Sequence, residues 1–225
     1  SVLFEDKVDF VGGAGVVAEH LKAAGAKVTF STILGDDPLK DFVLDRLGAS
    51  GVDVKAIIDT TRPTTNKNAI VVGGYRLLKI DTLDNRSISD TILEELVHAL
   101  GSVESEAILF SDFRHGIFNR RTTPMLIDAI PKNKFRVADS QVASRWGNIT
   151  EFKGFDLITP NEREARFALA DQDSGIRPLA SAVYDASRCK NLLLKLGEKG
   201  ILACSSPDHT SLDSFFTLDS FVDNL

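Results

Sequence analysis

Residues 154–166, with the sequence GFDLITPNEREAR, contain the two side chains whose types and spacing first suggest chemistry. Residues 155–159 form a short apolar run that predicts a buried strand, and Pro160 ends this run abruptly. Asn161 then stands where it can cap a helix, and Glu164 follows three residues later on the same helical face. An amide and a carboxylate at the carboxyl end of a strand can organise a hydrated Mg²⁺, which takes few direct protein ligands. The same pair can form a reciprocal helix cap without any ligand, so this stretch alone leaves both interpretations open.

Polar residues also follow other runs that predict strands. Asp112 and Arg114 leave the run at 107–111, Asp139 ends the run at 135–139, and the segment KLGEKG at 195–200 joins two later runs. Because the carboxyl ends of parallel strands meet at one edge of a sheet, these groups could gather there around a ligand. Each group also has a purely structural alternative, since the two aspartates could cap turns and residues 197–200 could form only a β-turn.

The usual short motifs for nucleotides and metals are absent from the sequence. There is no Gly-x-x-x-x-Gly-Lys-Ser/Thr phosphate loop, and the glycines at 12, 13 and 15 lack the spacing of a Gly-x-Gly-x-x-Gly turn. No His-Glu-x-x-His or paired cysteine motif indicates a zinc site. Among the histidines, His20 and His98 fall in predicted helices, whereas His115 follows a predicted strand end and stays a candidate.

Hydrophobic periodicity places the candidate groups in an alternating α/β chain. We expect helices near 16–24, 38–47, 89–100, 121–130, 161–169 and 179–188, and strands near 28–34, 107–111, 135–139, 155–159 and 192–196. Alternation of this kind predicts a mainly parallel sheet covered by helices. The runs at 201–205 and 214–222 predict antiparallel strands at one edge of that sheet.

Two further segments predict a small β flap apart from the main sheet. Residues 69–72 and 75–80 are β-rich runs joined by Gly73 and Gly74, which is typical of a tight hairpin. Residues 1–10 predict a charged strand that suits an exposed position. A flap of this kind can close over a small molecule.

Length and composition indicate an ordinary globular protein. The 225 residues, 43% hydrophobic and 26% charged, are enough for one sizeable domain. The net charge of −6 argues against a nucleic-acid partner. Two cysteines, Cys189 and Cys204, and the absence of a secretory signal indicate the cytoplasm. No apolar run is long enough to span a bilayer, so we expect no membrane partner.

Five segments, taken together, resemble the pfkB, or ribokinase-like, family of sugar kinases. They are GGAGVVAEHLKAAGAKVTF at 12–30, ILGDD at 33–37, RPTTNKNAIV at 62–71, ITPNEREA at 158–165 and LKLGEKG at 194–200. The resemblance implies a ribokinase-like three-layer α/β/α sandwich with a mainly parallel sheet, forming a single domain over 1–225. It also implies a small β lid with strands from about 1–11 and 64–82.

The resemblance implies ATP-dependent phosphoryl transfer, assisted by Mg²⁺, to a hydroxyl of a sugar or sugar phosphate. The RPTT, SDF and TPN segments are similar to those of the heptose 7-phosphate kinases of ADP-heptose synthesis, so a heptose 7-phosphate is the expected acceptor. Related heptose kinases are often fused to a nucleotidyltransferase, and lids in the family often pair, so we expect a homodimer through the lid.

The resemblance also implies two sets of site residues. The substrate-binding set contains Gly12, Gly13, Lys67, Lys79, Asp112 and Arg114. The cofactor-binding set contains Asn161, Glu164, Lys195, Gly197 and Gly200, in which Asn161 and Glu164 position Mg²⁺ as well. For Lys67 and Lys79 the structural alternative is an ordinary pair of exposed strand lysines.

The chain departs from the family pattern at several of these positions. Val16 stands where the family has a sugar-contacting asparagine, Arg114 and His115 replace a small residue and a lysine, and Ala69 replaces a basic residue. These departures keep open a non-catalytic sugar- or nucleotide-binding domain of the same fold. A nucleoside kinase also stays open as an alternative.

The two ends of the family pattern are missing from the chain. The family's first strand, with a sugar-binding aspartate, would lie before Ser1, and its Gly-Ala-Gly-Asp motif, with the catalytic base, would lie beyond Leu225. Asp219 and Asp223 lie outside any glycine-rich turn and do not replace that base. We therefore expect a truncated kinase domain. None of its residues is predicted to be the catalytic base, and the domain is not expected to turn over substrate by itself.

Overall fold

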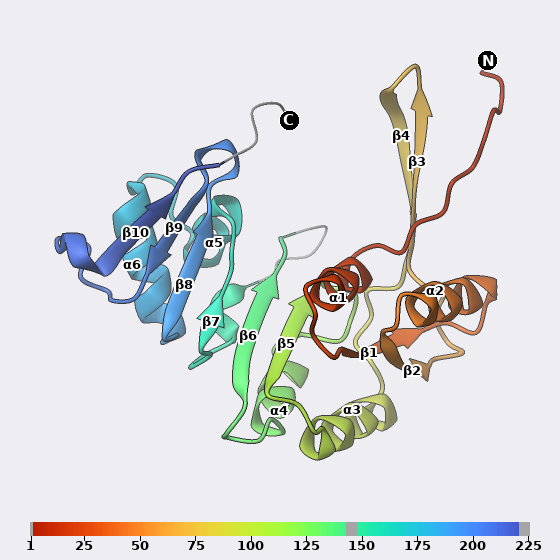
Figure 1. Ribbon diagram of the computed structural model, residues 1–225, viewed down its shortest axis with the longest axis horizontal. Helices are drawn as coiled ribbons and strands as arrows, with labels where there is room; N and C mark the ends of the chain where they lie inside the picture. The colour runs from red at the N-terminus through yellow and green to blue at the C-terminus, as the bar shows by residue number, and fades with distance from the viewer. Residues whose placement is uncertain (1, 143–147, 221–225) are drawn as a thin grey trace. The chain divides into compact units, whose positions relative to one another are not determined.

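The computed structural model describes residues 2–142 and 148–220. The chain divides into two compact units, Ser1–Glu95 and Leu96–Leu225, and the division falls within helix α3 (Asp90–Ser102). Figure 1 labels the elements of both units. Each unit is described by itself below.

The first unit begins with a parallel pair of strands and two helices. Its elements before the hairpin are α1 (Ala14–Ala23), β1 (Thr29–Leu34), α2 (Pro38–Ala49) and β2 (Asp53–Ile58). Strands β1 and β2 pair in parallel from Thr29 opposite Asp53 to Leu34 opposite Ile58. Their apolar side chains join those of the helices in a core that contains Ala18, Leu47, Val52, Val11, Val28, Phe30, Val43 and Val54.

Helix α2 begins where the sequence predicts it to begin. The side chain of Asp37 accepts hydrogen bonds from the main-chain N–H groups of Leu39, at 3.1 Å, and Lys40, at 3.3 Å. Pro38 occupies the first helical position, where its missing N–H costs nothing. Strand β2 was not predicted, although residues 52–58, VDVKAII, begin with alternating apolar and polar side chains directly after the glycines that end this helix.

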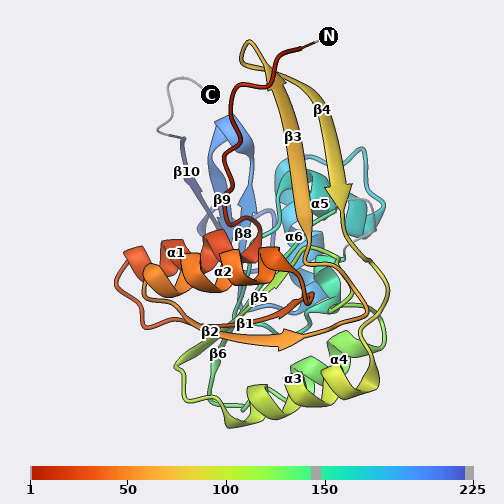
Figure 2. The same cartoon turned by 90° about the vertical axis from the view of Figure 1, so that its right-hand side faces the viewer.

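The predicted hairpin is present in the first unit as strands β3 (Asn66–Val72) and β4 (Tyr75–Thr82). The two turn residues, Gly73 and Gly74, have φ angles of 56° and 79°, a left-handed conformation that favours glycine. Figure 2 shows the two strands running side by side along their whole length. Every residue of β4 is exposed, so the hairpin presents both of its faces to solvent.

The strand predicted over residues 1–10 is not formed by residues 2–10, which contain no regular secondary structure. Their polar groups bond locally instead of joining a ladder. The main-chain N–H of Lys7 donates to Asp6, and its ammonium donates to Asp9 at 2.9 Å. A single extended segment without a paired neighbour gains none of the hydrogen bonds that make a strand stable.

The second unit contains a six-stranded sheet in the order β10-β9-β8-β7-β6-β5. Its strands are β5 (Ala107–Asp112), β6 (Phe135–Ser140), β7 (Leu157–Ile158), β8 (Asn191–Lys195), β9 (Ile201–Cys204) and β10 (Phe215–Leu218). Strands β5 to β8 are parallel, while β9 and β10 are antiparallel to their neighbours, as predicted. Strand β7 is shorter than predicted and pairs at two positions on each side.

Helices and short turns complete the second unit. They are α4 (Thr122–Asp128), η1 (Ile149–Glu151), α5 (Glu162–Leu169), α6 (Ile176–Ser187), η2 (Gly197–Lys199) and η3 (Leu212–Ser214). A cluster of aromatic rings packs β5 against η1. Phe110 lies 5.7 Å from Phe155 and 6.2 Å from Phe152 between ring centroids, and the latter two are fully buried. These contacts fix η1 next to the end of β5.

Candidate active site

The carboxyl edge of the sheet in the second unit is where four parallel strands end. Asp112 is the last residue of β5, Ser140 the last of β6 and Lys195 the last of β8, while Asn161 lies just beyond β7. Open α/β sheets bind their ligands at this edge. The structure therefore brings together the candidate residues that the sequence placed at strand ends in this unit.

Asp112 and Arg114 form a buried network at the end of β5. The guanidinium Nε of Arg114 lies 2.8 Å from Oδ2 of Asp112, and its Nη2 donates to Oγ of Ser140 at 3.1 Å. That hydroxyl donates in turn to Oδ2 of Asp112 at 2.9 Å, and Glu151 lies 3.6 Å from Nη2. Burial raises the pKa of Asp112, and the charge of Arg114 opposes that effect. The side chain of Arg114 is only 7% exposed, so its positive charge interacts mainly with groups inside the unit.

The backbone at Arg114 adopts the conformation that this network requires. Its φ angle is 60°, which is uncommon for a residue other than glycine. The main-chain N–H of Arg114 donates to Oδ1 of Asp112 at 2.8 Å, which closes a tight turn after the strand. His115, the neighbouring candidate, is half-buried.

Lys195 and Asp139 form a second charged contact at the same edge. Nζ of Lys195 donates to Oδ1 of Asp139 at 2.8 Å, and the hydroxyl of Thr159 donates to the same oxygen at 2.9 Å. The contact joins the ends of β6 and β8 across the end of β7. The lysine side chain is 43% exposed, so its ammonium also faces solvent. The sequence places Asp139 at a strand end, where it could join a ligand site or cap a turn, but its pairing with Lys195 was not predicted.

Asn161 and Glu164 form the reciprocal cap that the sequence offered as the structural alternative. The main-chain N–H of Glu164 donates to Oδ1 of Asn161, and that of Asn161 donates to Oε2 of Glu164, both at 2.8 Å. Glu164 is buried, and burial raises the pKa of its carboxyl group, with the charge of Asp139 adding to the effect. The cap therefore engages Oδ1 of Asn161 and Oε2 of Glu164.

The donor atoms at this edge suit magnesium better than a metal that needs a full protein cage. Within residues 2–142 and 148–220, no three side chains of histidine, cysteine, aspartate or glutamate form a metal-binding group. Mg²⁺ commonly keeps several waters and takes only one or two carboxylates. A buried carboxylate with a raised pKa also gains stability from a nearby cation, so Glu164 fits this ion.

The connection between β8 and β9 contains two glycines, and a different structural feature explains each of them. A Cβ atom on Gly200 would lie 2.0 Å from the carbonyl oxygen of Leu218, and its φ angle is 82°. A Cβ atom on Gly197, whose φ angle is 62°, would meet no atom within 4 Å. Close packing against the end of β10 therefore explains Gly200, while the positive φ angle alone favours glycine at position 197.

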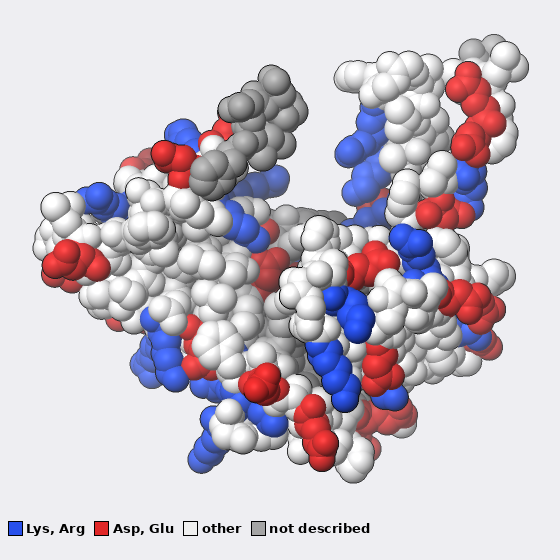
Figure 3. Space-filling model, in the orientation of Figure 1, with Lys and Arg blue, Asp and Glu red and all other residues white. Residues whose placement is uncertain are grey.

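The remaining candidates lie in the first unit. Gly13 has a φ angle of 56° and stands at the N-cap of α1, and a Cβ atom on Gly12 would meet nothing within 4 Å. The hairpin register places Lys67 opposite Asp81, and Nζ of Lys79 lies 3.3 Å from Oδ2 of that aspartate. Both lysines therefore share one face of the hairpin. Figure 3 shows basic and acidic side chains over the surface of the protein.

Comparison with known proteins gives a match along most of the chain. The sequence model described as "pfkB family carbohydrate kinase" matches residues 5–219. "Bifunctional protein HldE" of Helicobacter hepaticus is 30% identical over 181 residues, covering 77% of this chain and 37% of that protein. The protein of the same name from Geobacter metallireducens is 30% identical over 202 residues, covering 85% of this chain and 40% of that protein. The chain thus spans about two fifths of the length of these relatives.

Solved structures show the same fold at low sequence identity. Phosphofructokinase-2 from Escherichia coli, in complex with fructose-6-phosphate, superposes with a TM-score of 0.73 at 15% identity, over 95% of this chain and 70% of that chain. Ribokinase from Giardia lamblia superposes with a TM-score of 0.71 at 15% identity, over 96% of this chain and 74% of that chain. The predicted fold class, ribokinase-like α/β with a mainly parallel sheet, is confirmed. None of the described helices is long and apolar enough to cross a membrane.

Proposed function

The chain belongs to the pfkB family of carbohydrate kinases, and from this premise we propose that it is the sugar-kinase part of its parent protein. The proposed reaction transfers the γ-phosphoryl group of ATP to a hydroxyl of a sugar phosphate, releasing ADP and a proton. The observation that carries the proposal is the carboxyl edge of the second unit, which gathers Asn161, Glu164, Asp139 and Lys195 at neighbouring strand ends. Phosphoryl transfer needs mainly positioning and charge neutralisation, which such groups supply.

At this edge, Glu164 and Asn161 would hold Mg²⁺ and thereby the phosphates of the nucleotide. When bound, the ion neutralises charge that develops on the transferred phosphoryl group. Lys195 holds its ammonium beside Asp139 and partly in solvent, where it can approach a nucleotide phosphate. Gly197, which has open space beside its Cα, would line the nucleotide site in the following turn.

The proposed acceptor is a heptose 7-phosphate. The RPTT and TPN segments and the likeness to proteins named HldE support this choice. Lys67 and Lys79, which share one face of the exposed hairpin, would bind the phosphate that the sugar already carries. Gly12 and Gly13 would let the main chain approach the sugar, because no side chain covers Gly12.

A substrate panel tests the reaction and its acceptor. The parent protein would be assayed for ADP release with Mg-ATP and D-glycero-D-manno-heptose 7-phosphate, fructose 6-phosphate, ribose or adenosine. We expect the heptose phosphate to give the highest kcat/KM. Transfer to ribose with none to the heptose phosphate would refute the proposed acceptor, and preference for adenosine would indicate a nucleoside kinase.

The network around Arg114 favours a second candidate, a non-catalytic sugar- or nucleotide-binding domain. The buried guanidinium contacts Asp112 and Ser140 rather than facing a substrate, and Val16 cannot donate a hydrogen bond to a sugar hydroxyl. Calorimetry of the parent protein would then show ligand binding without turnover at saturating Mg-ATP. A robust rate in the same preparation would eliminate this candidate.

We further propose that the two units act as one ribokinase-like domain and that the hairpin pairs with that of a second copy. Strands β3 and β4 expose several apolar side chains, among them Val71 at 57% and Leu77 at 61%, and a second hairpin could cover them. Sedimentation of the protein and of a Leu77→Lys variant tests this pairing, since a dimer should dissociate in the variant. A monomer at all concentrations would refute it.

The relatives' shared description as bifunctional, together with the length that this chain leaves unmatched, supports a second proposal about the parent protein. The parent protein would contain a nucleotidyltransferase domain as well and would act in the cytoplasm, where ATP is available. Mass spectrometry of the purified parent protein and an assay for ADP-heptose formation test this proposal.

A further inference from the structure

The direction of the hairpin must be set at its base. Strand β4 is exposed at all of its eight residues, and Tyr75 at the turn is 75% exposed. A two-stranded ribbon whose side chains are mostly exposed can tilt as a body, because few packing contacts resist the movement. The segment that leads into the hairpin, residues 59–65, and the segment that leads out of it, residues 83–89, are therefore where we look for the contacts that hold it.

The incoming segment is firmly attached to the layer of β1, β2 and α2. Asp59 follows β2, and its main-chain N–H donates to the carbonyl of Leu34 at 2.8 Å. Thr64, just before β3, accepts from the N–H of Gly35 at 3.0 Å, and its own N–H donates to Asp37 at 2.7 Å. This segment is therefore anchored at both of its ends.

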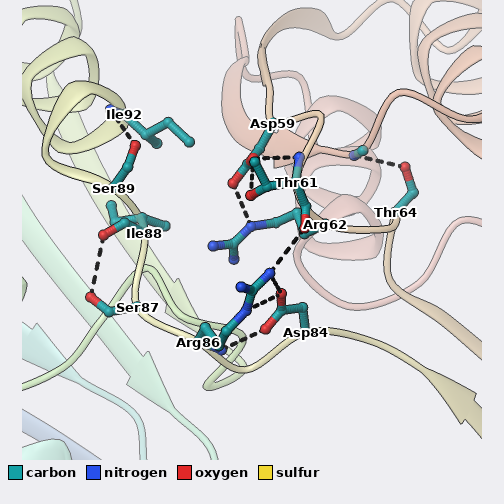
Figure 4. A network of polar contacts seen from close by, with 11 residues as sticks. Asp59, Thr61, Arg62, Thr64, Asp84, Arg86, Ser87, Ile88, Ser89 and Ile92 are labelled. Carbon is teal, nitrogen blue, oxygen red and sulfur yellow. Dashed lines mark hydrogen bonds and ion pairs between the residues drawn. The ribbon is translucent and has the colours of Figure 1, made fainter.

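The carboxylate of Asp59 also shapes the turn between those anchors. Its Oδ1 accepts from the main-chain N–H of Thr61 at 2.9 Å and from the hydroxyl of Thr61 at 2.7 Å. Its Oδ2 accepts from Nε of Arg62 at 2.6 Å, and the side chains of this ion pair are about nine-tenths buried. The turn that results presents the carbonyl oxygen of Thr61 toward the outgoing segment (Figure 4).

The outgoing segment reaches that carbonyl through Arg86. Nη2 of Arg86 donates to the carbonyl oxygen of Thr61 at 2.9 Å, and its Nε donates to Oδ2 of Asp84 at 2.8 Å. The main-chain N–H of Arg86 donates to the other oxygen of Asp84, also at 2.8 Å. Beyond Arg86 the chain is fixed again, because Ile88 is only 2% exposed and Ser89 caps α3.

We propose that Arg86 is a positioning residue: it ties the outgoing segment of the hairpin to the incoming one at Thr61 and so sets the direction of the hairpin for acceptor binding. The inference rests on the proposed function, because it takes Lys67 and Lys79 of the hairpin as the groups that bind the acceptor's phosphate. The carboxylate of Asp84 orients the guanidinium of Arg86. The same carboxylate accepts the main-chain N–H of Arg86 and so fixes the turn between the two residues.

An arginine suits this position because its planar fork can satisfy a carboxylate and a carbonyl at the same time, which a lysine ammonium does with poorer geometry. The hydrogen bonds from Arg86 also lower the pKa of Asp84 to about 2, so the pair keeps its charges in mildly acidic solution as well. The side chain of Arg86 is 68% exposed. We therefore expect its removal to change the global stability little and to act on the hairpin's direction.

A distance measurement within the first unit tests the positioning role without any assay of activity. Spin labels would be placed at Tyr75→Cys on the hairpin and Asp45→Cys on α2, both exposed, while the natural cysteines are buried. We expect the distribution of label distances to broaden in Arg86→Ala. The matched control is Lys55→Ala, which removes an exposed ion pair with Asp53 on β2, away from the hairpin, and should leave the distribution unchanged.

Kinetics of the parent protein test the consequence for the acceptor. Loss of one hydrogen bond at the base should raise the KM for the sugar phosphate by about 3- to 10-fold, with the KM for ATP nearly unchanged. Arg86→Lys should fall between the wild type and Arg86→Ala in both measurements. A general loss of structure would instead lower kcat and raise both KM values.

The two measurements separate failure of this inference from failure of the proposed function. An unchanged distance distribution in Arg86→Ala refutes the positioning role, whatever the enzyme does. A broadened distribution with an unchanged KM for the sugar phosphate refutes the link to the acceptor. If the wild-type protein phosphorylates no sugar, the proposed function fails, and the distance distribution alone decides whether Arg86 holds the hairpin.

Discussion

Replacing Glu164 by glutamine or by alanine separates its role in the helix cap from its proposed role in holding Mg²⁺. Glutamine keeps a side-chain oxygen that can accept the hydrogen bond from the N–H of Asn161, now made at 2.8 Å, but it removes the negative charge. Alanine removes both the acceptor and the charge. A residue that serves only the cap should therefore tolerate glutamine, whereas a metal ligand should tolerate neither substitution.

The structure gives the expected size of each effect. Alanine leaves the N–H of Asn161 without its partner and should cost about 1 kcal/mol of the free energy of unfolding. Glutamine should cost nothing, because burial raises the pKa of Glu164 and so disfavours the charged carboxylate in the folded state. In both variants kcat should fall about 100-fold, since loss of about 3 kcal/mol of charge stabilisation by the ion corresponds to that factor.

The raised pKa also fixes the sign of a pH dependence. The folded protein binds the proton of Glu164 more tightly than the unfolded chain does, so this group's contribution to stability falls as pH rises from the ordinary value of 4.5 through the raised one. Glutamine has no proton to lose, and Glu164→Gln should lack this decline. Urea unfolding at several pH values measures it.

The activity assay is ADP release by the parent protein at saturating ATP while the Mg²⁺ concentration is varied. The matched control is Glu162→Gln on the same first helical turn, whose carboxylate pairs with Arg166 at 2.8 Å and takes no part in the cap. We expect the control to keep the wild-type kcat and Mg²⁺ dependence. Full activity with an unchanged Mg²⁺ dependence in Glu164→Gln would refute the metal role and leave Glu164 as a cap alone.

Three further predictions concern the folded chain. Gly200→Ala should cost at least about 2 kcal/mol in urea unfolding, because the new Cβ overlaps main-chain atoms, whereas Gly197→Ala should cost about 1 kcal/mol; equal losses would contradict the packing role of Gly200. Arg114→Ala leaves the carboxylate of Asp112 buried without its cation and should cost about 3–5 kcal/mol by the same measurement, and a negligible loss would show that the pair is not needed. The lowered pKa of Asp84 adds stability that is present above pH 3.8 and is lost as pH falls toward about 2, so Asp84→Asn should lose less stability than the wild type over that range; parallel curves would contradict this.

Much of the fold follows from local patterns in the sequence. The cap at Asp37, the glycine turn at 73–74 and the alternation of runs after residue 89 each depend on neighbouring residues, and each is found in the structure. Strand β2 also has a local signal, the alternation in VDVKAII after the turn at Gly51, but it was overlooked. The strand expected at the N-terminus fails for a physical reason: its pattern is suitable, but strand formation needs a partner, which a local pattern cannot supply.

The candidate site was predictable in its location and less so in its contacts. Strand ends pointed to Asp112, Asn161 and Lys195, because parallel topology brings such ends to one edge. The contact of Lys195 with Asp139 joins residues 56 positions apart, and the burial of Arg114 depends on Ser140 and Glu151 from other elements. No local spacing encodes such contacts. For the same reason, no local pattern predicts the hydrogen bond between Arg86 and Thr61, 25 positions earlier.

The hairpin turn is also a point at which the chain can change length. Gly73 and Gly74 lie at the far end of an exposed ribbon, and a Cβ atom on either would meet nothing within 4 Å. The segments on either side are fixed separately, the first through Thr64 and the second through Ile88. Extra residues inserted between the two glycines, or a cut in the chain there, would leave both anchors intact. The turn is therefore suited to carry an inserted tag or peptide without disturbing the core of the first unit.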